Sequence, residues 1–272
     1  MSPIGIFDSG YGGLTVMKEI LKKLPQYDYL YLGDNARAPY GNRSFDTVYR
    51  YTLQCVNWFF SQGAPLVILA CNTASAKALR TIQQNDLPKI DPSKRVLGVI
   101  RPTTEIIGRF SKTKSIGILA TNGTVQSNSY VIEIEKLYPE LKVSQQACPM
   151  WVPLVENNEH NDAGADYFVR KNITEVLSQD KNIDTILLAC THYPLLRNKM
   201  LQFLPEGVTL LSQGEIVANS MVDYLKRHNE IEERITRKGV RQFYTTDSTT
   251  DFDNHASIFF GENVNSIHAD MR

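Results

Sequence analysis

The segment Val67-Ile68-Leu69-Ala70-Cys71-Asn72-Thr73 is a run of apolar residues that ends in a thiol and two small polar side chains. A short apolar run with such an end predicts a buried strand that carries a cysteine at its C-terminal tip. The same pattern recurs at Thr185-Ile186-Leu187-Leu188-Ala189-Cys190-Thr191-His192. Parallel α/β sheets hold their working residues at the carboxyl ends of strands. The two cysteines are therefore candidates for a matched pair of catalytic groups.

Length and charge narrow the class of protein. A chain of 272 residues suits two compact α/β domains of ordinary size. Lys plus Arg and Asp plus Glu both number 29, so we expect neither nucleic acid nor a membrane surface as a partner. No stretch approaches the roughly 20 apolar residues that a membrane span needs, and the first residues lack the pattern of a signal peptide. These features predict a cytoplasmic protein.

The four cysteines, at positions 55, 71, 148 and 190, form no C-x-x-C pair and no cluster with zinc spacing. We therefore expect free, reduced thiols and no metal site. Cys55 lies in a predicted helix among aromatic residues, and Cys148 lies beside Pro149 without a polar neighbour. Both are interpreted as structural residues.

A second correspondence accompanies the cysteine strands. The apolar segment Ile4-Gly5-Ile6-Phe7 precedes a glycine-rich turn at 8–13, and Ser115-Ile116-Gly117-Ile118-Leu119-Ala120 precedes Thr121-Asn122-Gly123-Thr124. Two correspondences in the same order indicate a duplicated α/β unit. The first turn is either an anion-binding corner or a tight turn that needs glycine, and the residues alone favour neither.

The predicted architecture is two similar doubly wound parallel-sheet α/β domains, related by pseudo-two-fold duplication, with the active site in the cleft between them. The polar segment 85–95, with two prolines, is the best linker in the chain. It divides the chain into a first domain of residues 1–92 plus 207–272 and a second domain of residues 93–206. The C-terminal tail has no cysteine corner, so we expect it to return to the first domain.

Two thiols that face one pocket suit a reaction that removes a proton from one face of a carbon and returns a proton to the other. That chemistry is racemisation or epimerisation. No lysine stands where a pyridoxal phosphate Schiff base is expected. A helix N-terminus and nearby donors can lower the pKa of a cysteine from the ordinary value of about 8.5, and the pattern after each of these cysteines is typical of a helix start. Asp8 and His192 are candidates to orient the thiols or share their protons.

Several hydroxyl and amide groups near the predicted strand tips are candidates to bind the carboxylate and ammonium of an amino acid. They are Ser9, Asn72, Thr73, Thr121, Thr124 and Thr191. Glu156 follows the apolar segment 149–155, and such an acid more often begins a solvated loop than belongs to a site.

Four ordered motifs carry a resemblance to a known family: Asp8-Ser9-Gly10, Pro39-Tyr40-Gly41, Ala70-Cys71-Asn72-Thr73 and Cys190-Thr191-His192-Tyr193-Pro194. Together they resemble the glutamate racemases, which make D-glutamate for peptidoglycan without a cofactor. The resemblance spans nearly the whole chain. It implies that Cys71 and Cys190 are the two acid/base residues, assisted by Glu156, and that the protein is a homodimer. Since the first motif begins at Asp8, we expect no dependence on an activator.

The resemblance also implies the substrate contacts, which are Asp8, Ser9, Pro39, Tyr40, Gly41, Asn72, Thr73, Thr191 and His192. Two positions depart from the family pattern. Arg101 stands where the family usually has glutamate, and Ser212-Gln213-Gly214-Glu215 replaces the usual Asp-Ser-Gly-Glu. These departures concern substrate tuning or the domain interface.

Three other functions are consistent with parts of this pattern. An aspartate or other amino-acid racemase would use the same pair of cysteines, although Pro39-Tyr40-Gly41 and the motif at 190–194 favour glutamate. A hydrolase or acyl transferase could use Cys190 with His192 as nucleophile and base, but it would leave Cys71 without a role. A binding protein without catalysis would use the glycine-rich corners and would need neither thiol.

Overall fold

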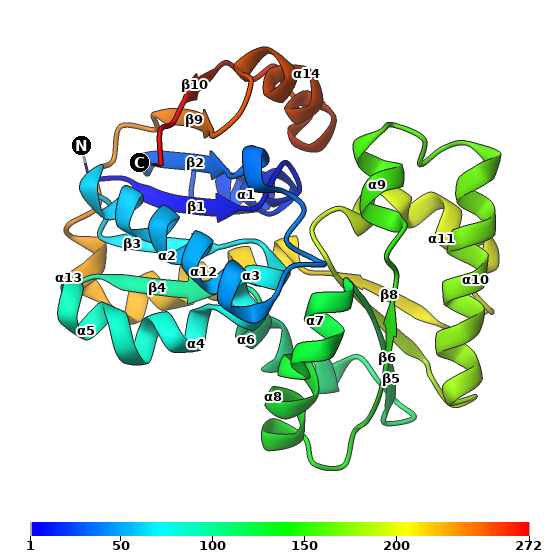
Figure 1. Ribbon diagram of the computed structural model, residues 1–272. Helices are drawn as coiled ribbons and strands as arrows, with labels where there is room; N and C mark the ends of the chain where they lie inside the picture. The colour runs from blue at the N-terminus through cyan, green and yellow to red at the C-terminus, as the bar shows by residue number, and fades with distance from the viewer. Residues whose placement is uncertain (1, 272) are drawn as a thin grey trace.

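The computed structural model describes residues 2–271, which form two sheets of parallel strands flanked by helices (Figure 1). The first sheet has six strands in the order β10-β9-β2-β1-β3-β4. They are β1 (Ile4–Asp8), β2 (Tyr29–Gly33), β3 (Leu66–Leu69), β4 (Arg95–Gly98), β9 (Arg241–Thr245) and β10 (Ser266–His268). The second sheet has four strands in the order β6-β5-β7-β8. They are β5 (Ser115–Ala120), β6 (Lys142–Ala147), β7 (Thr185–Ala189) and β8 (Thr209–Ser212).

The strand order confirms the duplicated unit. The spatial order β2-β1-β3-β4 of the first sheet recurs as β6-β5-β7-β8 in the second, and every pair is parallel. Strand β3 carries Cys71 at its end and pairs with β1, as β7 carries Cys190 and pairs with β5. The two cysteines therefore follow equivalent strands of two similar units.

Sheet membership differs from the predicted domain boundaries at two strands. Strand β4 lies after residue 92 but pairs with β3, so it belongs to the first sheet. Strand β8 lies after residue 206 but pairs with β7 in the second sheet. The prediction was wrong here because a polar, proline-containing segment marks a surface turn and carries no information on which sheet the next strand joins. The proposed boundaries move beyond Gly98 and beyond Ser212.

The longer helices cover the faces of the two sheets. They are α1 (Gly13–Lys23), α2 (Phe45–Ser61), α8 (Ser129–Leu137), α10 (Ala163–Gln179), α12 (Gly214–Arg227) and α14 (Thr249–Phe260). Shorter helices are α3 (Asn72–Lys77), α4 (Leu79–Thr81), α5 (Leu87–Ile90), α6 (Ile100–Thr104), α7 (Asn122–Ser127), α9 (Trp151–Glu156), α11 (Arg197–Phe203) and α13 (Asn229–Glu232). Within residues 2–271, every helix is too short or too polar to cross a lipid bilayer.

Local sequence signals account for the best-predicted helix. The Ser44 hydroxyl accepts a hydrogen bond from the Thr47 amide and caps α2, and Gly63 adopts a φ of +86° just beyond its end. Val48, Cys55 and Phe59 recur at helical spacing and are fully buried against the first sheet. Cys55 therefore lies in a core, as predicted.

Three segments differ from the sequence-based expectation. The predicted linker at 85–95 contains the end of a π-helical turn and helix α5. The segment before Glu156 forms helix α9, and a short parallel strand, β10, follows α14. The C-terminal strands return to the edge of the first sheet beside β2, as expected, and Figure 1 shows them in orange and red there.

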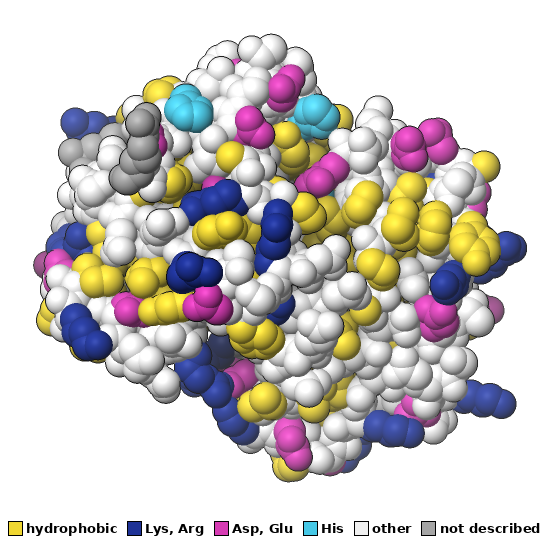
Figure 2. Space-filling model, viewed as in Figure 1, with side chains coloured by type: hydrophobic (Ala, Val, Ile, Leu, Met, Phe, Trp, Pro, Cys, Tyr) yellow, Lys and Arg dark blue, Asp and Glu magenta, His cyan; other side chains and the backbone are white. Residues whose placement is uncertain are grey.

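Charged side chains of both signs are interspersed on the face shown in Figure 2. This distribution agrees with the equal numbers of basic and acidic residues.

Candidate active site

A cavity of about 80 Å³ lies between the carboxyl ends of β3 and β7 and is lined by both Cys71 and Cys190. The first unit contributes Ser9, Ala38, Pro39, Tyr40, Gly41, Asn42, Cys71, Asn72 and Thr73. The second contributes Thr121, Asn122, Cys148, Pro149, Val152, Pro153, Glu156, Cys190, Thr191 and His192. The structure thus brings together every predicted site residue except Asp8 and Thr124.

Cys71 stands between the end of β3 and the start of α3, where its sulfur accepts a hydrogen bond from the Ala74 amide at 3.5 Å. The Ser9 hydroxyl lies 3.4 Å from the same sulfur. Burial of the side chain, reinforced by the nearby Asp8 carboxyl, raises the pKa of Cys71 to about 12 although both hydrogen bonds oppose the shift. The donors at the helix start do lower this pKa, but burial outweighs them.

Cys190 follows β7 and lies beside His192, whose Nδ1 is 3.9 Å from the cysteine sulfur. The Nε2 atom of the same ring lies 3.0 Å from Glu156 Oε1. Burial lowers the pKa of His192, but the hydrogen bonds and charges of Cys190 and Glu156 outweigh burial and raise it to about 10. The imidazole is therefore protonated near neutral pH and puts a positive charge beside the Cys190 sulfur.

Helix α9 brings Glu156 to this histidine. Trp151 begins the helix, is fully buried, and packs edge-on against Tyr193 with ring centroids 4.8 Å apart. Glu156 is the last residue of the same helix, which ends beside the ring of His192. The residues alone favoured a solvated loop for Glu156. The signal for a helix was the apolar run from Met150 to Val155, which loop residues rarely show.

Asp8 lies behind the cavity wall at the end of β1 and is 1 % exposed. Its Oδ1 accepts a hydrogen bond from the Gly10 amide at 2.9 Å, and its Oδ2 lies 3.4 Å from the Thr191 hydroxyl. Burial raises the pKa of Asp8, and the positive charge of His192 opposes that rise. Asp8 does not line the cavity itself and is joined to it through Thr191, which does; its contact with substrate stays a prediction.

Hydroxyl groups join the two units at the cavity. The Thr73 and Thr121 hydroxyls, one from each unit, lie 2.9 Å apart. Thr124, predicted to contact substrate, is fully buried with its hydroxyl 3.1 Å from that of Thr121, so it lies one step behind the wall. Asn122 donates to Asn42 Oδ1 at 3.2 Å, and neither amide was predicted from the sequence.

Tyr40 lines the cavity but directs its hydroxyl elsewhere. The hydroxyl donates a short hydrogen bond to Asp34, whose carboxylate also accepts one from Arg37 Nε at 2.7 Å. Asp34 is fully buried, so these two donors compensate its charge. Tyr40 therefore contributes its ring and backbone to the cavity. The backbone of the next residue, Gly41, accepts from the Gly123 amide at 2.8 Å and so ties this loop to the second unit.

Cys148, interpreted from the sequence as structural, also lines the cavity. It is 1 % exposed, its sulfur lies 3.7 Å from the Gln146 carbonyl oxygen, and burial raises its pKa well above the ordinary range. It therefore holds its proton near neutral pH. Between residues 2 and 271, no three His, Cys, Asp or Glu side chains are grouped as metal ligands would be.

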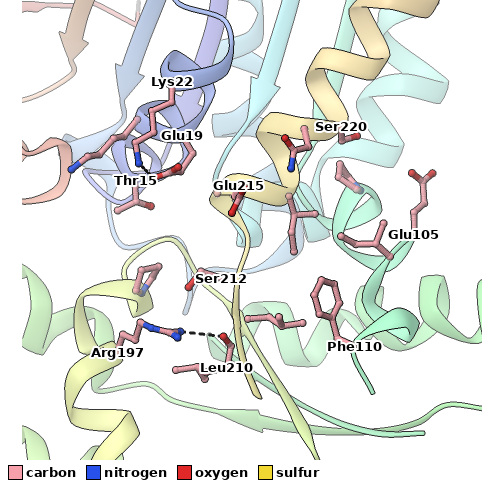
Figure 3. A pocket seen from close by; sticks show the side chains of 18 of the residues that line it. Thr15, Glu19, Lys22, Glu105, Phe110, Arg197, Leu210, Ser212, Glu215 and Ser220 are labelled. Atoms are coloured by element: carbon pink, nitrogen blue, oxygen red, sulfur yellow. Dashed lines mark hydrogen bonds and ion pairs between the residues drawn. The ribbon is translucent and has the colours of Figure 1, made fainter. Parts of the chain in front are cut away.

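A larger cavity of about 1010 Å³ opens elsewhere between the units (Figure 3). Its wall includes Thr15, Phe110 and Ser212, and Arg197 donates to the Leu210 carbonyl oxygen at 3.1 Å inside it. It contains neither cysteine, and its Lys22 and Glu19 side chains pair with each other at 2.6 Å. The smaller cavity is the candidate active site, because it gathers the nucleophilic and titratable groups.

The two departures from the family pattern lie in different places. The Arg101 side chain is 76 % exposed and pairs with Glu105 at 2.9 Å, outside the cavity of the cysteines. Gln213 is buried and accepts a hydrogen bond from the Asn72 side chain, which lines that cavity.

Residues 4–221 match the family described as Asp/Glu/Hydantoin racemase. The chain belongs to this racemase family. It is 37 % identical to a glutamate racemase from Persephonella marina over 96 % of this chain and 94 % of that protein. It is 35 % identical to a glutamate racemase from Streptococcus suis over 99 % of this chain and 98 % of the relative.

Solved structures of the family agree with the fold. A glutamate racemase isoform from Bacillus anthracis superposes with a TM-score of 0.89 at 34 % identity, covering 99 % of this chain and 97 % of that one. A racemase from Francisella tularensis, solved in complex with D-glutamate, gives a TM-score of 0.88 at 28 % identity, covering 99 % and 98 %. The racemase fold therefore extends over both sheets.

Proposed function

We propose that the protein interconverts L-glutamate and D-glutamate through two thiols, one acting as base and the other as acid. The observation that carries the proposal is the single cavity lined by Cys71 and Cys190, which follow equivalent strands of two similar units. Inversion at a carbon requires a base on one face and an acid on the other. Two equivalent strand ends that face one cavity from opposite units meet that requirement.

The reaction starts when a thiolate takes the α-proton and the electron pair of the C–H bond remains on the substrate carbon. The opposite thiol then gives its proton to the other face of that carbon, and its own bonding pair stays on sulfur. After one turnover the two sulfurs have exchanged protonation states. The enzyme in this state is ready for the reverse reaction. Because only protons are transferred, no external reductant, oxidant or cofactor is consumed.

The surrounding charges support a proposal for the resting state. Cys71, with a pKa of about 12, holds its proton near neutral pH, and Asp8 lies behind it. Cys190 has the protonated ring of His192 at 3.9 Å, with Glu156 on the far side of that ring. We propose that the resting enzyme uses Cys190 as the base and Cys71 as the acid. His192 compensates negative charge at Cys190, and Glu156 orients His192.

The proposed substrate follows from the relatives and from the polar wall of the cavity. The relatives are glutamate racemases, and one solved relative holds D-glutamate. Hydroxyl and amide groups that can bind the carboxylates and the ammonium are Ser9, Asn72, Thr73, Thr121, Asn122 and Thr191. We propose that these side chains hold glutamate with its α-carbon between the two sulfurs.

Isotope exchange tests the mechanism. The purified protein is incubated with L-glutamate in D₂O, and both enantiomers are examined by proton NMR after a few per cent conversion. New D-glutamate should carry deuterium at Cα, because the acid thiol exchanges with solvent, whereas recovered L-glutamate should gain little. Equal labelling of both enantiomers would contradict the two-thiol mechanism. A hydrolase that uses only Cys190 and His192 would exchange no α-hydrogen.

Cysteine variants assign the roles. Cys71→Ala and Cys190→Ala should each lower racemisation at least a thousandfold, and Cys55→Ala should leave it within twofold because Cys55 lies in the core outside the cavity. Substantial activity in either site variant would remove that cysteine from the mechanism. The same assay with L-aspartate separates a glutamate racemase from an aspartate racemase.

We further propose that the protein supplies D-glutamate for peptidoglycan, in the cytoplasm, as a homodimer. The family resemblance supports these proposals. Light scattering tests the assembly: a homodimer has twice the 30.8 kDa mass of the chain, and a mass of one chain at all concentrations would contradict it.

A further inference from the structure

Three buried side chains form a closed ring of hydrogen bonds beside the candidate active site. Asn72 Nδ2 donates to Gln213 Oε1 at 2.8 Å, and Gln213 Nε2 donates to the Tyr130 hydroxyl oxygen at 2.6 Å. The Tyr130 hydroxyl then donates to Asn72 Oδ1 at 2.6 Å. Every member donates once and accepts once within the ring. The three groups therefore hold one another in a single orientation.

The ring lies where the chain passes between the two sheets. Gln213 directly follows β8 of the second sheet and precedes α12. Its Nε2 also lies 3.0 Å from the Thr103 hydroxyl and 3.3 Å from the Val99 carbonyl oxygen, which share its second N–H bond, in the segment that leaves β4 of the first sheet. The chain leaves the first unit after β4 and returns to it after β8, and Gln213 connects these two segments. The ring also includes Asn72 from the first unit and Tyr130 from the second.

Asn72 connects this ring to the chemistry. It is the first residue of α3, adjacent to Cys71, and its side chain lines the cavity of the two cysteines. The ring occupies its carbonyl oxygen and one N–H bond. An asparagine amide has two N–H donors, so the second is left for a substrate in the cavity. Membership of the ring also makes the amide orientation at this wall unambiguous.

The ring depends on glutamine at position 213. The racemases that the sequence resembles usually have serine there, in the pattern Asp-Ser-Gly-Glu. A serine has no amide nitrogen, and its side chain is shorter by one methylene group and the amide carbon. It could not accept from Asn72 while donating both to Tyr130 and to the segment of Val99 and Thr103, as the two N–H bonds of Gln213 do here.

We propose that Gln213 is a positioning residue that, together with Tyr130, fixes the Asn72 amide and the start of α3 at Cys71 in the geometry that racemisation needs. The inference rests on the proposed function for its kinetic consequence. Its structural consequence, a changed environment of the Cys71 sulfur, is independent of the substrate.

Two variants break the ring with little change in volume. Gln213→Met removes both the donor and the acceptor while keeping the length of the side chain, and Tyr130→Phe removes only the hydroxyl. Each should lower kcat/KM at least tenfold in both directions. The matched control is Tyr138→Phe at the end of α8, whose hydroxyl donates to the exposed Glu105 carbonyl at 2.7 Å. It should stay within twofold of wild type.

A double-mutant cycle separates positioning from general stabilisation. If Gln213 acts through Asn72, adding Gln213→Met to Asn72→Ala should lower kcat/KM by no more than a further twofold. A further loss equal to the effect of Gln213→Met alone would overturn the inference. Thermal unfolding confirms that each protein is folded at the assay temperature.

The rate at which iodoacetamide alkylates Cys71, measured by peptide mass spectrometry, reports on the surroundings of its sulfur in the absence of substrate. Cys71 should react at least fivefold faster in Gln213→Met than in wild type, while Cys190 stays within twofold. If wild type does not racemise glutamate, a faster reaction of Cys71 still supports positioning, and only the proposed function fails. If wild type racemises glutamate but Gln213→Met leaves both kcat/KM and Cys71 reactivity within twofold, the positioning role is overturned.

Discussion

The two candidate acid/base residues stand in opposite electrostatic surroundings. A buried carboxyl, Asp8, lies behind Cys71, whereas a protonated imidazole adjoins Cys190. Two equal thiols would share one proton without preference. Burial and the Asp8 carboxyl raise the pKa of Cys71 to about 12, so Cys71 holds its proton near neutral pH, which supports its proposed role as the acid. The difference between the surroundings of Cys71 and Cys190 comes from individual neighbouring residues, because the strands that carry the two cysteines are equivalent.

His192 should make stability depend on pH in a predictable direction. Its pKa is about 10 in the folded protein and about 6.5 when unfolded, so its protonation favours the folded state. That contribution is fully present below pH 6.5 and is lost as the pH rises through about 10. At about 1.4 kcal/mol per pKa unit, it amounts to a few kcal/mol.

Urea unfolding of wild type and His192→Asn between pH 6 and pH 10 measures this contribution. The advantage of wild type should shrink steadily over that interval, while titrating groups that do not contact His192 cancel in the comparison. An advantage that is the same at pH 6 and pH 10 would show that His192 is not the group responsible.

At the scale of elements, the site depends on how closely the start of α1 approaches the loop after β7. A Cβ atom at Gly12 would lie 2.2 Å from the Thr191 hydroxyl oxygen and 2.5 Å from His192 Nδ1. The backbone at Gly12 has a φ of −58°, which any residue adopts. The need for glycine at this position is therefore one of space, because the Thr191 and His192 side chains approach it closely.

Gly12→Ala should therefore displace Thr191 and His192. We expect kcat/KM to fall at least tenfold and the free energy of unfolding to fall by about 1–3 kcal/mol from overpacking. Enzyme assays and urea unfolding measure the two effects. The control is Gly164→Ala in α10, where an added Cβ meets no atom within 4 Å. It should change stability by no more than about 1 kcal/mol. Equal behaviour of the two variants would refute the steric argument.

At the scale of the whole molecule, the cavity joins two units that have separate sheets. A ligand in it contacts residues that follow β1 and β3 as well as residues that follow β5 and β7. Binding should therefore stabilise both units together. The two tryptophans report on them separately, since Trp58 lies on α2 and Trp151 on α9.

Glutamate at about 100 times its Kd should stabilise the folded state by about 2.7 kcal/mol. For a chain of this size that raises the melting temperature by roughly 5–10 °C. The shift should be equal when followed by fluorescence in Trp58→Phe, which retains Trp151, and in Trp151→Phe, which retains Trp58. A shift confined to one tryptophan would place the ligand within one unit. Glutamine, which lacks the second carboxylate, is the control and should give a smaller shift.

The sequence by itself determined the strands, their duplication and the two cysteines at their tips. Apolar runs that end in Cys71 and Cys190 are local patterns, and local patterns decide which residues form a strand and where it ends. The motifs around Pro39, Asn72 and Thr191 also indicated most of the cavity wall, because the carboxyl ends of parallel strands meet at one edge.

Only the tertiary structure decided which sheet β4 and β8 join, because pairing depends on long-range packing that a polar linker does not encode. It also placed Asp8 and Thr124 behind the wall and buried Cys71 enough to raise its pKa. The same is true of the contact between Gln213 and Asn72, which lie far apart in sequence. Burial, charge and hydrogen-bond geometry arise when distant segments meet, so no local pattern could specify them.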